Sequence, residues 1–231
     1  MSKCVFLGTC VAAAALSWTT AAKAEPPVKN DNLTIYYGDV RGPTCDPTND
    51  SVGMITANTP LNTLLYNHTR RAPPPPAPPM TPPPAHCNPL LAPDGHQITL
   101  GEFKAVVGRT VVSCINTGTH SALHYSGLQP GGTYSVWIFK VNPSPPPPFL
   151  AGGTLGVTAL SENHFVASEG GEGEIVRTTP DENLSVFGSI GPCFLDFPAQ
   201  LHLVYHSDGQ THGPVPGSQE TWVVNAFFSF P

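Results

Sequence analysis

The segment most informative about the fold is Leu128-Gln129-Pro130-Gly131-Gly132-Thr133-Tyr134-Ser135-Val136-Trp137-Ile138. Pro-Gly favours a turn, and the residues after it are threonine, aromatic and β-branched residues that are typical of strands. The run continues to Val141 with a period of two. This pattern predicts a tight turn that leads into a half-buried strand over Thr133–Val141.

Similar short runs, bounded by Gly, Pro or Asp-Gly, occur along the rest of the chain. No amphipathic segment long enough for a three-turn helix interrupts them. The predicted strands are Gln97–Val107, Arg109–Ile115, Thr119–Ser126, Leu201–His206 and Thr221–Phe230, with two further candidates at Asn32–Tyr37 and Leu61–Asn67. Many short strands with frequent turn signals predict an all-β protein, and we expect a single antiparallel Greek-key sandwich.

The segment Leu128–Ile138 has the form Leu-x-Pro-Gly-x-x-Tyr-x-Val-x-Ile. It resembles the tyrosine-corner segment of fibronectin type III and related immunoglobulin-like sandwiches. The resemblance implies that Leu128 anchors a crossing between sheets and that the Tyr134 hydroxyl bonds to backbone upstream. It covers about eleven residues, so it implies a sandwich that is immunoglobulin-like in the broad sense and says nothing about activity.

Residues 1–24 have the pattern of a secretory signal peptide. Lys3 precedes an apolar run from Val5 to Leu16, and Ala22-Lys23-Ala24 places small residues at a cleavage site. We therefore expect an exported protein, periplasmic or secreted, in an oxidising compartment.

The charge balance excludes some partners. Loss of the leader removes Lys3 and Lys23 but no acidic residue, so the formal net charge goes from −6 to −8. A chain this acidic is not expected to bind nucleic acid or an anionic membrane surface. No second apolar stretch is long enough for a transmembrane helix.

Four cysteines remain after the leader: Cys45, Cys87, Cys114 and Cys193. An even count in an exported chain predicts two disulfides, which three pairings satisfy. We prefer Cys45–Cys87, which ties the N-terminal segment across a proline tract, and Cys114–Cys193, which joins distant parts of the C-terminal half.

Two proline tracts divide the chain, at Pro73–Pro84 and Pro143–Pro148. Proline has no N–H for a sheet ladder, so both tracts are expected to be exposed loops. We expect residues 25–95 to be a strand-bearing N-terminal segment and residues 96–231 to hold the main core. The acidic run Glu169–Glu174 is expected to be a solvated hairpin loop.

The histidines are the strongest chemical signal. In Leu201–His206, period two places His202 and His206 opposite Leu201, Leu203 and Tyr205. In Thr119–Ser126 it places His120 and His124 opposite Leu123 and Tyr125. We expect all four imidazoles to be reachable from solvent, and to share one face if the two strands are neighbours.

Copper and zinc favour such ligands. His202 and His206 are roughly 13 Å apart on one strand, too far to share an ion. Asp208 and His212 follow His206 closely, so His206 is the expected ligand if a metal binds. The alternative is that the histidines are ordinary outward-facing polar residues and that Asp208-Gly209 is a common turn. Neutral imidazole is the ligand form, so binding is expected to weaken as the pH falls through about 6.5.

Three function classes are open. The first is an exported, non-catalytic binding or surface module for an unknown extracellular or periplasmic ligand. It rests on the fold and on the absence of a nucleophile elbow, a phosphate loop and a His-Glu-x-x-His motif. The second is a copper- or zinc-binding protein that uses the histidines. The third is a hydrolase of wall or matrix material that uses Asp208 with His206 or His212.

Cleavage of the leader is directly testable. Protein recovered after export should begin at Glu25, because cleavage is expected after Ala24. N-terminal sequencing or intact mass measures this. Exported protein that keeps Met1 would contradict both the compartment and the reasoning that links it to disulfides.

Overall fold

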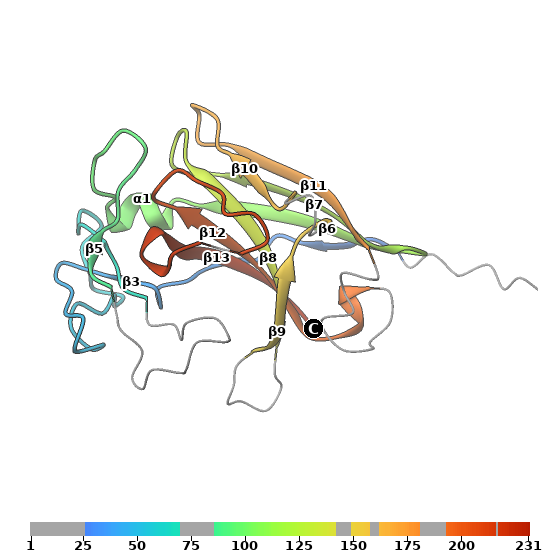
Figure 1. The fold of residues 1–231 in the computed structure, drawn as a ribbon, viewed down its shortest axis with the longest axis horizontal. Coiled ribbons are helices and arrows are strands. Elements are labelled where there is room, and N and C mark those ends of the chain that lie inside the picture. The colour runs from blue at the N-terminus through green and yellow to red at the C-terminus, as the bar shows by residue number, and fades with distance from the viewer. Residues whose placement is uncertain (1–25, 70–85, 142–148, 158–161, 181–192, 216) are drawn as a thin grey trace, which may run out of the picture.

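The computed structural model describes residues 26–69, 86–141, 149–157, 162–180, 193–215 and 217–231, and these residues are mostly β-structure (Figure 1). The predicted leader and both proline tracts lie outside the described residues. The elements are β1 (Val28–Asn30), β2 (Leu33–Ile35), β3 (Val40–Arg41), β4 (Tyr66–Asn67), β5 (Asn88–Pro89), α1 (Leu100–Lys104), β6 (Val107–Ile115), β7 (Gly118–Ser126), β8 (Thr133–Val141), β9 (Phe149–Thr154), β10 (His164–Val166), β11 (Gly173–Pro180), η3 (Phe194–Asp196), β12 (Ala199–His206), η4 (Gln219–Thr221) and β13 (Trp222–Phe230).

Two antiparallel sheets form the body of the protein. The first has the order β1-β6-β7-β11, and the second has the order β10-β8-β12-β13-β2, with β9 also paired to β8. A small third sheet, β3-β4-β5, lies beside them. The predicted all-β antiparallel sandwich is confirmed.

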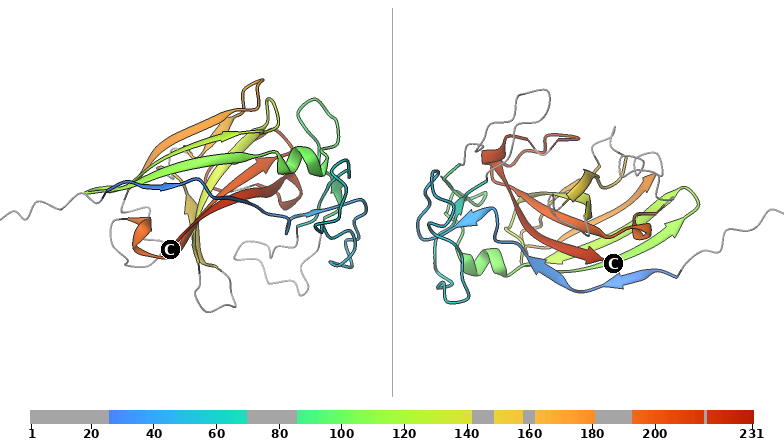
Figure 2. Two further views of the ribbon diagram at one scale, coloured as in Figure 1. Left: turned by 180° about the vertical axis from the view of Figure 1, so that it is seen from behind. Right: turned by 90° about the horizontal axis from the view of Figure 1, so that it is seen from below.

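The core lies between the two large sheets because each strand alternates its faces. Val112, Leu123 and Ile175 come from the first sheet, while Val136 and Leu203 come from the second, and all five are buried in one cluster. The N-terminal strands connect the layers: β1 pairs with β6 in one sheet, and β2 pairs with β13 in the other (Figure 2).

Tyr134 makes the contact with upstream backbone that the pattern of Leu128–Ile138 predicts. Its hydroxyl accepts a hydrogen bond from the backbone N–H of Gln129 at 2.9 Å, and its ring packs 5.6 Å from Phe165 and 5.2 Å from Tyr205. Gly131 has a φ of +69°, which the turn before the strand requires. Burial raises the pKa of Tyr134, so the phenol stays protonated.

The prediction of a strand over Gln97–Val107 is wrong. Residues Leu100–Lys104 form α1, and the strand begins only at Val107. Thr99 and Glu102 form a capping box, in which the Glu102 N–H donates to Thr99 Oγ1 at 3.3 Å and the Thr99 N–H donates to Glu102 Oε2 at 2.7 Å. The same one-turn helix buries Leu100 and Phe103, which are three residues apart.

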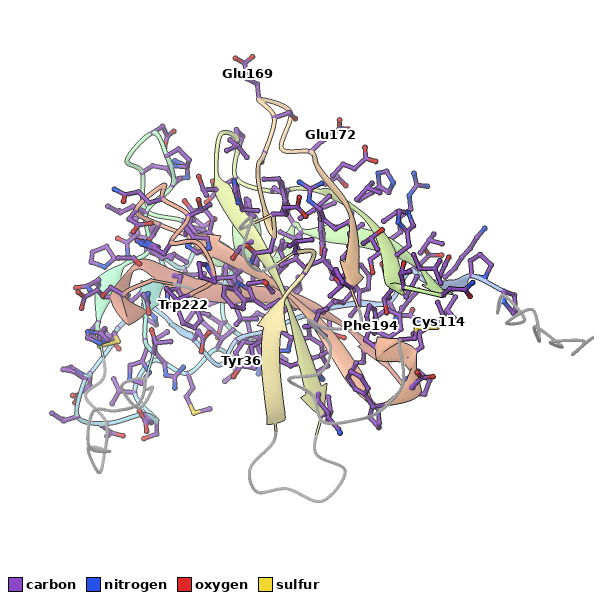
Figure 3. All side chains as sticks on the ribbon, turned by 45° about the vertical axis from the view of Figure 1, so that its right-hand side comes forward. Tyr36, Cys114, Glu169, Glu172, Phe194 and Trp222 are labelled. Carbon is purple, nitrogen blue, oxygen red and sulfur yellow. A yellow bond between two sulfur atoms is a disulfide. The ribbon has the colours of Figure 1, made fainter. Side chains whose placement is uncertain are left out.

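Both disulfides are present with the preferred pairing, Cys45–Cys87 and Cys114–Cys193. Cys114 is the penultimate residue of β6 in the first sheet, and Cys193 directly precedes η3, which leads into β12 of the second. Figure 3 shows Cys114 close to Phe194 at one end of the molecule. This disulfide therefore ties the two layers together, in agreement with an oxidising compartment.

Among the described residues, no helix is long and apolar enough to cross a membrane. Glu169 and Glu172 project from the tip of the β10–β11 connection and are exposed (Figure 3). This placement agrees with the expected solvated hairpin loop.

Removal of the Tyr134 hydroxyl tests the corner. Tyr134→Phe should lower the free energy of unfolding by about 1–2 kcal/mol, because the buried Gln129 N–H loses its acceptor. Urea unfolding measures the change, with Tyr66→Phe as a control for loss of a phenol outside the core. Unfolding curves of Tyr134→Phe that match the wild type would contradict a structural role for the bond.

Candidate metal centre

His206 is the last residue of β12, which lies between β8 and β13 in the second sheet. It is directly opposite Thr133 of β8 and Trp222 of β13, on the face that points away from the sandwich core. Figure 3 places Trp222 at the end of β13 nearest the small third sheet. His206 is only 2% exposed, so the expectation that it is reachable from solvent is wrong.

One ring nitrogen of His206 is held in place. Its Nε2 lies 2.7 Å from Ser135 Oγ, and the indole Nε1–H of Trp137 donates to the same oxygen at 2.8 Å. The Ser135 oxygen accepts from the indole, and its bond to His206 forms with either imidazole tautomer, because a serine hydroxyl can donate or accept. The tautomer with its proton on Nε2 is the one that binds a metal ion through Nδ1, because it leaves the lone pair there. That Nδ1 is buried and has no hydrogen-bond partner.

The surroundings keep His206 neutral. Burial lowers its pKa to about 4, and the neighbouring His212 and His164 also lower it, while the carboxylate of Asp208 acts in the opposite direction. At neutral pH the side chain is therefore an uncharged imidazole, which is the form that binds metal ions.

The loop after β12 carries two more donors. Gly209, with a φ of +70°, turns the chain, and its carbonyl accepts from Thr133 Oγ1 at 3.1 Å, so the loop is fastened to β8. Asp208 Oδ2 lies 2.9 Å from His212 Nε2. Gly217 packs against the His212 ring, because a Cβ at this position would come within 2.1 Å of it. A side chain at residue 217 would therefore displace His212.

His206, Asp208 and His212 each present a ligand atom within 4.8 Å of the others. Ligand atoms around one zinc ion lie about 2.0–2.2 Å from the metal, so small side-chain adjustments would enclose an ion. The side chains of His212 and Asp208 are 28% and 23% exposed, which leaves a route from solvent. The loop therefore brings together the three residues that the sequence analysis selected.

The structure adds His164, which the sequence analysis missed. It opens β10 directly opposite Ser135, so the two side chains share a face of the sheet. Its Nδ1 is buried without a hydrogen-bond partner, and it is near enough to lower the pKa of His206. A three-residue strand is too short to show a period, so the sequence carried no signal for it.

His202 lies apart from this group, in agreement with the spacing along the strand. It is 4% exposed, so the expectation that solvent reaches it is also wrong. Its ring lies 4.6 Å from Phe139 and 5.4 Å from Phe227, and its Nε2 bonds to Gln200 at 2.7 Å. Aromatic neighbours on the adjacent strands cover it.

His120 and His124 do not join the other histidines. They lie on β7 in the first sheet, whereas β12 belongs to the second, so the four imidazoles do not share one face. His120 Nδ1 lies 3.2 Å from Thr178 Oγ1, and His124 Nε2 lies 3.7 Å from Glu174 Oε1. Both are half-buried polar positions on the outer side of the sheet.

Ser135 and His206 are hydrogen-bonded, as are the serine and histidine of a hydrolase triad. A nucleophilic serine must reach substrate, and an acid must orient the other nitrogen of its histidine. Ser135 is 3% exposed, His206 Nδ1 has no partner, and the Asp208 carboxylate bonds to His212. Within the described ranges these three groups therefore do not form a nucleophilic triad.

Comparisons with known proteins place the chain in no family: no family model, no curated protein and no solved structure matches it.

The buried neutral imidazole predicts acid sensitivity of the metal-free protein. Unfolded His206 takes up a proton near its ordinary pKa, whereas folded His206 does so only at about 4. The unfolded state then binds more protons, so the free energy of unfolding should fall between about pH 6.5 and 4, by at most about 3 kcal/mol from this residue.

Urea unfolding of wild type and His206→Gln over this pH range measures the effect. The variant should show a flatter pH profile, while the control His120→Gln should follow the wild type. Equal profiles for wild type and His206→Gln would contradict a buried neutral imidazole.

Proposed function

We propose that the chain is an exported, non-catalytic β-sandwich protein that binds a copper(II) or zinc ion at His206, Asp208 and His212. The observation that carries this function is the convergence of three donors on one space, with a buried Nδ1 of His206 that has no other partner. The metal ion would be the ligand of the binding module.

The neighbours of His206 support the same function. A metal-binding histidine is usually fixed through its second nitrogen, and Ser135 supplies that contact, itself held by Trp137. His164 would be the fourth ligand, because it shares the face of Ser135 and has a buried, unpartnered Nδ1. Two or three imidazoles and one carboxylate suit copper(II) and zinc better than calcium or magnesium.

We also propose that the sandwich is immunoglobulin-like in the broad sense and that the protein acts in the periplasm or outside the cell. The Tyr134–Gln129 hydrogen bond supports the first statement, because it is the contact of a tyrosine corner. The two disulfides support the second. A compartment outside the cytoplasm is also one in which a protein meets copper and zinc.

Metal titration tests the function. Chelator-stripped protein should bind one equivalent of copper(II) and of zinc in calorimetry. Copper(II) should also quench the tryptophan fluorescence, because the only tryptophans beyond the leader are Trp137 and Trp222, which both adjoin His206. Zinc should bind with little quenching.

The variants His212→Ala and Asp208→Asn should each weaken binding by about tenfold or more, since loss of a direct ligand costs at least as much as loss of its supporting contact. These two side chains are partly exposed, so both variants should fold. The double variant His120→Ala/His124→Ala is the matched control and should bind like the wild type. Unchanged binding in His212→Ala would overturn the proposed site.

A further inference from the structure

A second group of donors lies at the small third sheet. Cys45 follows β3, His68 follows β4 and Cys87 directly precedes β5. One ligand atom from each of the three residues lies within 4.8 Å of the others. The two sulfurs form a disulfide in this structure, so the group holds both thiol chemistry and an imidazole in one place.

His68 is a buried residue with a ring nitrogen that is available to bind a metal ion. It is 3% exposed, and its Nε2 is buried without a hydrogen-bond partner. The Asp50 carboxylate oxygen Oδ1 lies 3.4 Å from that nitrogen. Burial and the neighbouring Arg41 both lower the pKa of His68, so the imidazole is neutral.

Arg41 organises the segment that brings Asp50 to His68. Its Nε donates to the Asp50 carbonyl at 3.0 Å, and its guanidinium also donates to the carbonyls of Gly38 and Val40 at 3.1 and 2.8 Å. The arginine is therefore fixed beside the group and places positive charge near it. Such charge stabilises thiolates, which are the metal-binding form of cysteine.

We propose that Cys45, Cys87 and His68 form a redox-controlled metal site. The disulfide closes the site, and reduction opens it to one zinc ion held by two thiolates, by His68 Nε2 and by a carboxylate oxygen of Asp50. Thiolate, imidazole and carboxylate are the three ligand types that bind zinc, and four such donors suit its tetrahedral geometry. The site is separate from the one at His206 and does not depend on it.

The chemistry balances with a dithiol as the reductant. The dithiol reduces the Cys45–Cys87 bond in two exchange steps and leaves as its own disulfide, and the protein gains two thiols. Zinc then displaces two protons from these thiols. Cys45 and Cys87 are half-buried, whereas Cys193 of the other disulfide is buried, so the reductant meets Cys45–Cys87 more readily.

Cobalt(II) is the probe that tests the site, because sulfur ligation gives it an intense thiolate-to-metal charge-transfer band. The site at His206 offers only nitrogen and oxygen and cannot produce this band. Protein that has been reduced with a dithiol, and then separated from the dithiol under argon, should bind one cobalt ion. Its absorption spectrum should then show the charge-transfer band. Oxidised protein should show no band, and zinc should displace the cobalt.

Three variants distinguish cobalt binding at Cys45, Cys87 and His68 from cobalt binding at His206. His68→Gln should weaken the charge-transfer titration by about tenfold or more, and Cys45→Ser/Cys87→Ser should abolish the band. His212→Ala should leave it unchanged, so failure of the first site and failure of this one are distinguishable. A band of equal strength and affinity in His68→Gln would overturn the assignment of the imidazole.

Circular dichroism of the reduced protein completes the test. If reduction leaves the β-structure intact and no thiolate–cobalt band develops, the proposal is wrong. If reduction unfolds the metal-free chain, zinc should restore the β-structure, because ligand binding then supplies folding free energy. Failure of zinc to restore it would equally overturn the proposal.

Discussion

The pairing register between β8 and β12 sets which side chains of these two strands face the core and which face away from it. Eight consecutive residue pairs join these central strands. The pair Tyr134–Tyr205 faces the core, and the next pair, Thr133–His206, faces away from it. A shift of one residue would move every side chain to the other face. The corner and the candidate metal centre therefore depend on the same ladder of backbone hydrogen bonds.

The candidate metal centre at the end of β12 combines one fixed, buried ligand with two partly exposed ones. β8 and β12 fix His206 and its supporting Ser135 in a buried position, while the loop after β12 brings Asp208 and His212 from the solvent side. Thr133 ties that loop back to β8. Binding of the proposed metal ion would need little rearrangement, because only the two loop side chains would have to move.

The two disulfides occupy different environments. Cys114–Cys193 joins the two sheets, and its burial at Cys193 protects it. Cys45–Cys87 lies at the small sheet beside a buried imidazole and a carboxylate. In a chain with only 11% charged residues, the arginine and the acids around this second disulfide are a local concentration of charge. This difference in burial and in charged neighbours is the basis for proposing a chemical role for Cys45–Cys87 and not for Cys114–Cys193.

Local patterns were enough to predict the strands around Tyr134 and the grouping of His206, Asp208 and His212, because turn residues and period two act over a few positions. The even cysteine count predicted two disulfides but left three pairings, of which the preferred one is present. The helix at Leu100–Lys104 also has a local signal, which is the capping-box spacing of Thr99 and Glu102. The strand-like composition of Gln97–Val107 hid that signal. Only the tertiary structure decided that His206 is buried, that His120 and His124 lie in the other sheet, and that His164 and Ser135 adjoin the site. Burial and cross-strand partners depend on which strands pair, and residues far apart in the sequence set that pairing.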